Sequence, residues 1–354
     1  MMKKIQILLL GAMLGLTACN DWLDVNPKTS IPTDKQFSSE SGFKDALTGV
    51  YIKMGSATLY GADLSFGYID ELAGIYSGYP GYETSIVFDQ SMVYDYDNKF
   101  KTKKNAIYAD FYNVIANVNN IIAHTESKRE VLVTPRYYET MRGEALALRA
   151  FLHFDLLRLF GPIYKEEPNA KAIAYRTTYD RVPTPILTAQ AVVEAVLKDL
   201  HEAEDLLKSS DPLDFFTDPY DEGYKSKNGF LINREFRMNL FAVKAMLARV
   251  YCYKGDAESK ALALKYAREV IDANQHFKLI DAQSAANYNS IRYSEQIFGL
   301  SVYELDKLLT ANGMDAEGER SDMHYTTSES HFNEFFETAG VGVTDWRKLP
   351  ECSN

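Results

Sequence analysis

Apolar side chains recur at helical spacing in several long stretches of the chain. The first is residues 39–54, SESGFKDALTGVYIKM, where apolar residues follow one another at intervals of three and four. This stripe consists of Phe43, Ala46, Leu47, Val50, Tyr51 and Met54. The hydroxyl of Ser39 or Ser41 could cap the start of the segment. The pattern predicts an amphipathic helix with one buried face.

The same periodicity returns along most of the chain. It predicts helices over residues 105–127, 136–160, 189–207, 234–256 and 257–274. The second of these carries an apolar stripe of Leu148, Leu152, Leu156 and Leu159. Gly161 and Pro162 would end that helix, and Thr188 is placed to cap the next one. Long helical segments therefore dominate the predicted fold.

The last two predicted helices form a recognisable pair. Small residues occupy the positions where the two helices must approach each other, namely Ala245, Ala248, Ala263 and Ala267. Tyr251 and Tyr266 supply bulk, and Gly255 allows the chain to turn between them. The pair resembles a tetratricopeptide helix–turn–helix, which must stack on other repeats to bury its faces. We expect a mainly α, tetratricopeptide-like helical repeat scaffold with long, irregular, aromatic-rich loops.

Three segments lack the helical pattern. Residues 74–98 alternate Tyr with Gly, Pro, Ser and Asp, which is typical of turns. Residues 163–185 are predicted to be a loop rich in Pro and Tyr, and residues 211–229 a polar loop.

The first of these loops is a candidate ligand site. Its aromatic residues include Tyr76, Tyr79, Tyr82, Tyr94 and Tyr96. Tyrosine rings can cover the apolar C–H faces of a sugar while nearby polar groups bond its hydroxyls. The alternative is that these rings pin the loop to the helices beneath it. We predict that at least one of them contacts a ligand.

The N-terminus carries a targeting signal. Lys3 and Lys4 precede the apolar residues 5–16, a run shorter than the roughly 20 residues needed to cross a bilayer. The sequence LTAC follows, which resembles a bacterial lipobox. We therefore expect a lipoprotein signal peptide over residues 1–18, acylation of Cys19 and a polar tether over residues 19–36. A secreted protein with a free Cys19 is the alternative.

Composition narrows the range of functions that the protein can have. The 354 residues carry a formal net charge of −11 and no basic cluster, which argues against binding to nucleic acid. Tyr and Phe, at 24 and 19 residues, far outnumber the 2 Trp. Of the other two cysteines, Cys252 is predicted to pack as a small apolar residue, although a disulfide with Cys352 is possible.

No catalytic or metal-binding signature appears in the sequence. Nucleotide-binding glycine loops, HExxH and GxSxG are all missing, and the six His residues are scattered. We expect His201 on a solvated face and His153 in the core. Asp63, Asp70 and Glu71 could serve as glycosidase carboxylates, but with 49 acidic residues in the chain some lie near any cleft by chance. The sequence predicts no enzyme activity, no metal and no cofactor.

Several stretches, in order, resemble the SusD/RagB family of outer-membrane nutrient-binding lipoproteins. They are CNDWLDVNPKTSIPTDKQF, GFKDALTGVY, RGEALALRAFLHFDLLRLFGPIY, LKDLHEAEDLL, KAMLARVYCYKGD and VTDWRK, the last with Asp345 and Arg347. Family members usually continue well beyond the final element. We therefore expect residues 37–354 to form a SusD-like helical domain with loop insertions, incomplete at its C-terminus.

The resemblance implies a function. It implies a lipid-anchored, non-enzymatic protein on the outer face of the outer membrane that captures an oligosaccharide. It also implies a partner, a TonB-dependent, SusC-like transporter that takes up the glycan. The family's binding residues do not carry over by motif, so the tyrosine site rests on the residues alone. A peptide- or protein-binding tetratricopeptide-type adaptor at the outer membrane is the alternative function.

Overall fold

The computed structural model describes residues 33–74, 98–211, 230–279 and 293–311, together with 330, 333 and 334. In these ranges the chain is mainly helical, as predicted. The elements in chain order are α2 (Thr33–Gln36), α3 (Glu40–Met54), α4 (Tyr68–Leu72), α6 (Asn98–Ser127), η2 (Arg129–Val131), α7 (Tyr137–Phe160), β1 (Lys171–Ala174), β2 (Ile186–Thr188), α8 (Ala189–Ser210), η4 (Arg234–Phe236), α9 (Leu240–Lys254), α10 (Ala257–Ile271), η5 (Tyr293–Glu295) and α12 (Leu305–Ala311). None of the described helices is apolar over a length sufficient to span a membrane.

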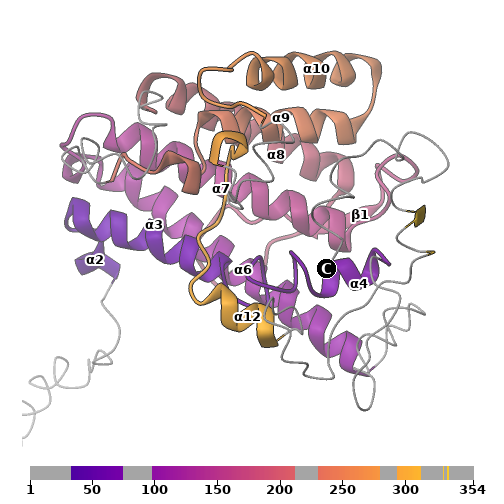
Figure 1. Ribbon diagram of the computed structural model, residues 1–354. Coiled ribbons are helices and arrows are strands. Elements are labelled where there is room, and N and C mark those ends of the chain that lie inside the picture. Colours follow the sequence, from indigo (N-terminus) through magenta and orange to yellow (C-terminus); the bar gives the residue numbers. More distant parts are fainter. Residues whose placement is uncertain are drawn as a thin grey trace, which may run out of the picture.

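Successive long helices pack side by side (Figure 1). Helix α3 lies on α6, α6 on α7, α7 on α8, α8 on α9, and α9 on α10. This arrangement is the stacked, tetratricopeptide-like scaffold that the sequence predicts.

Helix α7 lies at the centre of the stack. Leu148, Leu152 and Leu156 are fully buried, as predicted, whereas Leu159 is half-buried near the end of the helix. Its neighbours α6 and α8 cover opposite sides, so α7 is apolar around most of its circumference rather than along one stripe.

The predicted end signals at Ser39, Thr188 and Gly161 are confirmed. The Ser39 hydroxyl accepts a hydrogen bond from the Gly42 N–H at 3.2 Å, and Thr188 accepts one from the Ala191 N–H at 3.2 Å. Helix α7 ends at Gly161, whose N–H donates to the Leu157 carbonyl at 2.9 Å.

The α9–α10 pair has the predicted geometry. Gly255 ends α9 with a φ of 78°, a left-handed conformation that favours glycine. Asp256 then caps α10 by accepting the Ser259 N–H at 2.9 Å. The rings of Tyr251 and Tyr266 lie nearly parallel between the helices, with centroids 6.1 Å apart. This packing confirms that the two tyrosine rings fill the space between the helices.

Several elements differ from the prediction. Residues 163–185 were expected to form a loop, yet β1 pairs with β2 in a two-stranded antiparallel sheet. The buried Ile173 and the bond from the Ala189 N–H to the Ala170 carbonyl at 3.0 Å hold this sheet against the start of α8. Helix α6 begins seven residues before the predicted position 105, and the last four residues of the expected tether form α2. The helix predicted over residues 234–256 is shorter: Asn239 caps α9, so it begins at Leu240, and residues 234–236 form the separate turn η4.

The prediction that Cys252 packs as a small apolar residue is wrong. Its side chain is exposed. The preceding residue, Tyr251, faces the core, and position 252 therefore lies on the solvent-facing side of α9. The possible partner Cys352 lies outside the described residues.

A buried cation joins α7 to the segment that precedes α9. Arg234 is fully buried and pairs with Glu144, which is also fully buried. Its Nε donates to Asp211 Oδ1 at 2.7 Å. Arg237 Nε donates to Glu144 Oε2 at 3.0 Å, and the Tyr51 hydroxyl donates to the same oxygen at 3.0 Å. Burial raises the pKa of Glu144, but the two guanidinium groups outweigh it and hold the pKa below its usual value.

A second buried ion pair joins α7 to α8. Arg149 donates twice to Asp199, from Nε at 2.6 Å and from Nη2 at 2.8 Å. The Tyr175 hydroxyl donates to Asp199 Oδ2 at 2.5 Å, and Arg149 Nη1 donates to Asn119 Oδ1 at 3.0 Å. This cluster joins α6, α7, α8 and the residue after β1 through side chains alone.

The contact between α7 and α8 depends on a glycine. A Cβ at Gly143 would lie 2.8 Å from Leu207 Cγ and 3.4 Å from the Ala203 carbonyl oxygen. We expect Gly143→Ala to destabilise the protein by about 1–3 kcal/mol, because α7 and α8 must separate. Urea unfolding followed by circular dichroism measures this change.

Gly49 provides the matched control. It lies in the middle of α3, and an added Cβ would contact nothing within 4 Å. Alanine loses less conformational entropy in a helix, so we expect Gly49→Ala to stabilise the protein by about 0.5–1 kcal/mol. Equal shifts in the two variants would contradict this account of the α7–α8 contact.

Candidate functional site

The residues predicted to act directly lie outside the described part of the chain. Residues 75–97 include all five candidate tyrosines, Tyr76, Tyr79, Tyr82, Tyr94 and Tyr96. Cys19, Asp345 and Arg347 also lie outside it. The site is therefore built from the described elements that flank the tyrosine segment and from the pockets on their surface.

The helices on either side of the tyrosine segment are joined to each other. The rings of Tyr68 in α4 and Phe100 in α6 lie 5.3 Å apart, and both are buried. Lys103 Nζ pairs with Asp63 Oδ1 at 2.6 Å. Burial nevertheless raises the pKa of Asp63, although Lys103 opposes this shift. Residues 74 and 98, which flank the tyrosine segment, therefore belong to two parts of the chain that pack against each other.

A pocket of about 210 Å³ lies beside α4, and we call it the Asp155 pocket. Its lining residues are Tyr60, Leu64, Ile69, Asp155, Arg158, Leu159 and Arg249. Tyr76, the first candidate tyrosine, follows Ile69 by only seven positions in the sequence. The pocket is thus the described hollow whose lining comes nearest in sequence to the predicted ligand site.

On the polar side of this pocket, three donor groups surround one carboxylate, Asp155. The Tyr60 hydroxyl donates to Asp155 Oδ2 at 2.9 Å. Asp155 Oδ1 makes no hydrogen bond, although Arg158 and Arg249 lie 3.5 and 3.6 Å from it. Burial raises the pKa of Asp155 despite the two guanidinium groups and the phenol.

This geometry suits a ligand that accepts hydrogen bonds. The exposed guanidinium groups of Arg158 and Arg249 could donate to ligand oxygens, while the buried Asp155 carboxylate balances their charge. Leu64, Ile69 and Leu159 form the apolar remainder of the lining. A sugar ring, with an apolar face and hydroxyls at its edge, presents this combination.

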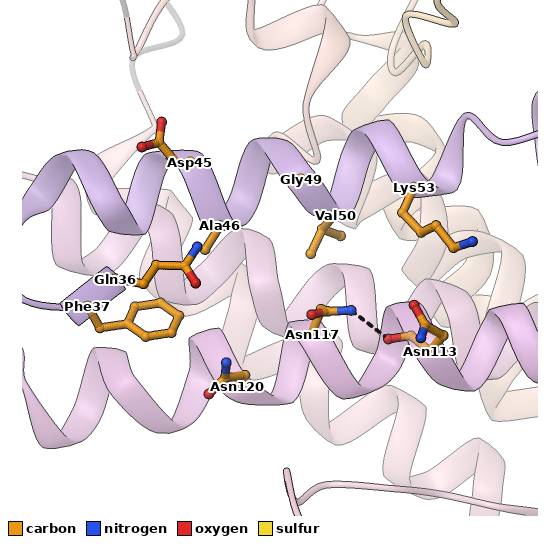
Figure 2. Close-up of a pocket in the computed structure, with 10 residues that line it drawn as sticks. All are labelled: Gln36, Phe37, Asp45, Ala46, Gly49, Val50, Lys53, Asn113, Asn117 and Asn120. Carbon is orange, nitrogen blue, oxygen red and sulfur yellow. Dashed lines mark hydrogen bonds between the residues drawn. The ribbon is translucent and has the colours of Figure 1, made fainter. Parts of the chain in front are cut away.

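A second hollow, the α3–α6 groove, has a volume of about 310 Å³ (Figure 2). Its residues from α3 include Ala46, Gly49, Val50 and Lys53, while α6 contributes three asparagines, Asn113, Asn117 and Asn120. Gln36, Phe37 and Asp45 complete the lining. The groove shares no lining residue with the Asp155 pocket.

The described residues show no arrangement of ligands for a metal. They contain no group of three or more His, Cys, Asp and Glu side chains that could hold one. Of the carboxylates weighed for glycoside hydrolysis, Asp63 is buried and paired with Lys103, and Glu71 is also buried.

His153 lies in the core, as predicted. Its Nε2 accepts the Arg176 N–H at 2.9 Å, so the proton is on Nδ1, which lies 2.8 Å from the Arg149 carbonyl oxygen. His201 was expected on a solvated face, but this is only partly right. Its side chain is 41% exposed, and Nε2 lies 2.8 Å from the Tyr251 hydroxyl across the α8–α9 interface.

Burial of His153 makes stability depend on pH. Desolvation lowers its pKa to about 3, whereas the unfolded chain has an ordinary histidine. The unfolded state therefore binds a proton below pH 6.5 that the folded state does not. Between pH 6.5 and 3 we expect this residue to reduce stability by about 1.4 kcal/mol per pH unit. Urea unfolding at pH 7, 6 and 5 measures the slope.

His153→Gln is the control for that slope. Glutamine keeps a donor and an acceptor but does not titrate, so the variant should lose stability less steeply below pH 6.5 than the wild type. Identical slopes would show that His153 does not titrate in this way.

Comparison with known proteins identifies the family. Residues 21–217, more than half of the chain, match a SusD-like family described as starch-binding and associating with the outer membrane. The chain belongs to this family. The resemblance seen in the sequence is therefore confirmed.

Two curated relatives of this SusD-like chain are also SusD-like proteins. A SusD-like protein of Formosa agariphila is 24% identical over 269 residues, which is 74% of this chain and 44% of the relative. A SusD-like protein of Bacteroides ovatus is 22% identical over 228 residues, which is 62% of this chain and 36% of the relative. The chain thus spans less than half the length of either relative.

Solved structures show the same fold. A SusD superfamily protein from Bacteroides thetaiotaomicron superposes with a TM-score of 0.61 at 19% identity, covering 84% of this chain and 62% of that structure. A SusD-like carbohydrate binding protein from Bacteroides vulgatus gives a TM-score of 0.62 at 15% identity, covering 84% and 59%. At these identities the likeness establishes the fold alone.

Sequence reasoning missed both hollows. Asp155 and Arg249 are charged residues that a helical pattern assigns to the solvent-facing side, and they lie on different helices. The signal available was an acidic residue within a mostly apolar stretch, FLHFDLLRLF, since a charge placed among core positions requires partners. The identity of those partners depends on packing that the sequence does not reveal.

Proposed function

We propose that this SusD-like protein captures an oligosaccharide at the cell surface and delivers it to a TonB-dependent, SusC-like transporter. Membership of an outer-membrane-associated, carbohydrate-binding family supports the class of function. The observation that carries the proposal to this chain is the Asp155 pocket, which combines two exposed guanidinium groups, held by the Asp155 carboxylate, with an apolar wall.

The tyrosine segment completes the proposed site. Tyr76, Tyr79 and Tyr82 follow α4, and Tyr94 and Tyr96 precede α6. Their rings would cover sugar faces while Arg158 and Arg249 bond hydroxyls at the edge. In this proposal the protein binds the glycan without cleaving it, and needs no cofactor.

Calorimetric titration with a panel of polysaccharides tests the site. We expect the Tyr76/Tyr79/Tyr82 triple Ala variant to bind its glycan at least tenfold more weakly than the wild type. The triple Phe variant is the matched control, because it keeps the rings and removes only the hydroxyls. Unchanged affinity in the triple Ala variant would rule out these tyrosines, and no binding to any glycan would refute the proposed function.

The lipid anchor and the transporter need separate tests. A single acyl chain gives only marginal membrane binding, so acylation of Cys19 with two or more chains would account for a lasting anchor. Mass spectrometry of the mature N-terminus should show an acylated Cys19, and Cys19→Ala should release the protein from membranes. Affinity purification of the anchored protein should recover a SusC-like transporter, and its absence would refute the proposed partner.

A further inference from the structure

We propose that the Asp155 pocket selects acidic glycans, and that Arg158 and Arg249 together bind the carboxylate or sulfate group of one sugar unit. This inference rests on the proposed function, because it concerns the charge of the glycan captured at the same site. The family is described as starch-binding, and starch is neutral, so an acidic ligand would distinguish this chain within the family. The inference can fail while glycan capture stands.

The pocket holds more positive than negative charge. Arg158 and Arg249 both pair with Asp155, at 3.5 and 3.6 Å from its Oδ1. Among the described residues that line the pocket, Asp155 is the one carboxylate, so the two guanidinium groups share a single counter-charge. One positive charge at the pocket is therefore left uncompensated by the described part of the chain.

The larger buried ion-pair cluster has no such imbalance. In that cluster Arg234 and Arg237 lie against two carboxylates, those of Glu144 and Asp211. The whole chain carries a formal net charge of −11, so a general excess of basic residues does not explain two guanidinium groups side by side. Like charges held close together repel each other unless an opposite charge lies between them. The second guanidinium group at the pocket thus favours an anion from outside the chain.

Both guanidinium groups are accessible to a ligand. Their side chains are 46% and 43% exposed, for Arg158 and Arg249 respectively. Each lies farther from Asp155 Oδ1 than the about 2.7–3.2 Å of an N–H···O hydrogen bond, so its N–H groups remain able to donate to a ligand. Guanidinium groups bind carboxylates and other oxyanions through paired hydrogen bonds.

The two arginines are placed to act on one oxyanion. Arg158 comes from α7 and Arg249 from α9, and both approach the same oxygen of Asp155. Arg249 also lies over the ring of Phe154, with its guanidinium carbon 5.5 Å from the ring centroid. These contacts limit the movement of the side chains before a ligand binds, which lowers the entropy lost on binding.

The apolar wall favours an acidic sugar over a free inorganic anion. Leu64, Ile69 and Leu159 line the same pocket as the guanidinium groups, and they can cover the C–H face of a sugar ring. The volume of about 210 Å³ is smaller than the roughly 300 Å³ at which pockets for drug-sized ligands begin. We therefore expect the pocket to hold one acidic unit of a longer glycan.

Calorimetry with matched acidic and neutral probes tests the inference. Oligogalacturonate is compared with its methyl ester, which has the same rings and length but no charge. Alginate oligosaccharide provides other carboxylates, carrageenan oligosaccharide provides sulfate without carboxylate, and maltodextrin is a second neutral probe. Arg158→Gln removes one cation and leaves Asp155 paired with Arg249. Arg129→Gln is the matched control, because it makes the same change in charge at an exposed ion pair outside the lining.

We expect the wild type to bind at least one acidic probe at least tenfold more tightly than either neutral probe, with an affinity that falls as salt rises. Arg158→Gln should weaken that probe by tenfold or more, because a charge-assisted hydrogen bond is lost, while Arg129→Gln leaves it unchanged. Asp155→Asn should strengthen binding of the same probe, because it removes the counter-charge and keeps an acceptor for the Tyr60 hydroxyl. Damage to the fold would not produce such a gain.

The other outcomes separate this inference from the proposed function. If the protein binds neutral probes and no acidic one, the inference is wrong and the proposed function stands. If an acidic probe binds with the same affinity to Arg158→Gln and Asp155→Asn as to the wild type, its charge is bound elsewhere and the inference is overturned. A response limited to the carrageenan probe supports the inference and identifies the anion as a sulfate. If no glycan of either kind binds, the proposed function fails and this inference fails with it.

Discussion

Replacing Arg234 with alanine is expected to lower the free energy of unfolding by about 3–5 kcal/mol. Arg234 is fully buried, and it neutralises Glu144 on α7 and Asp211 at the end of α8. Without the guanidinium group, two buried carboxylates remain near each other, and of these two Arg237 pairs with Glu144 alone. Chemical unfolding at neutral pH measures the loss.

Arg129→Ala is the matched control for Arg234. The side chain of Arg129 is 62% exposed, and its ion pair with Glu139 is 4.0 Å long. Exposed pairs of this kind contribute less than about 1 kcal/mol, so this variant should unfold near the wild-type midpoint. A loss of the same size at both positions would show that burial does not determine the cost.

The second large effect concerns the partner of Arg149. Asp199→Ala leaves a guanidinium group in the core that has lost both of its charged hydrogen bonds. We expect a loss of about 3–5 kcal/mol in the free energy of unfolding, because the buried cation remains uncompensated. The Tyr175 hydroxyl also loses its acceptor, which adds an unpartnered donor.

A double variant without either charge separates the effect of charge from that of packing. Arg149→Met combined with Asp199→Leu removes both charges and keeps apolar volume in their place. This double variant should be more stable than Asp199→Ala alone, because no uncompensated charge is left in the core. If the double variant is the less stable, the charges themselves hold α7 and α8 together.

The helical scaffold could be predicted from the sequence because its signals are local. Ser39, Thr188, Gly161 and Gly255 each act within a few residues of their own position, and all four occur where the pattern placed them. Apolar spacing likewise depends only on the segment in which it occurs.

The sheet could not be predicted in the same way. Strands β1 and β2 have 4 and 3 residues, too few to show an alternating pattern. Contacts from distant elements hold them, such as the bond from the Tyr112 hydroxyl on α6 to the Ala174 carbonyl at 2.8 Å. Nothing in residues 171–188 alone specifies these contacts.

The surface hollows were the least predictable part. Asn113 and Asn117 are exposed, and a periodicity argument assigns them to a plain solvent-facing side of α6. The groove arises only when Gly49 of α3 is placed opposite them, which requires the packing of two helices separated by more than 40 residues. The aromatic segment could be recognised from the sequence alone, because Tyr recurs there among Gly and Pro residues.

The Tyr51 hydroxyl determines which parts of the protein unfold together. The Tyr51 hydroxyl donates to Glu144 on α7 and accepts the N–H of the fully buried Met238 at 2.9 Å, a contact that spans 187 positions in the sequence. Helix α3 cannot separate from α7 without also freeing the segment before α9. These three parts therefore form one cooperative unit, and the Met238 amide proton should exchange with solvent only when the whole unit opens.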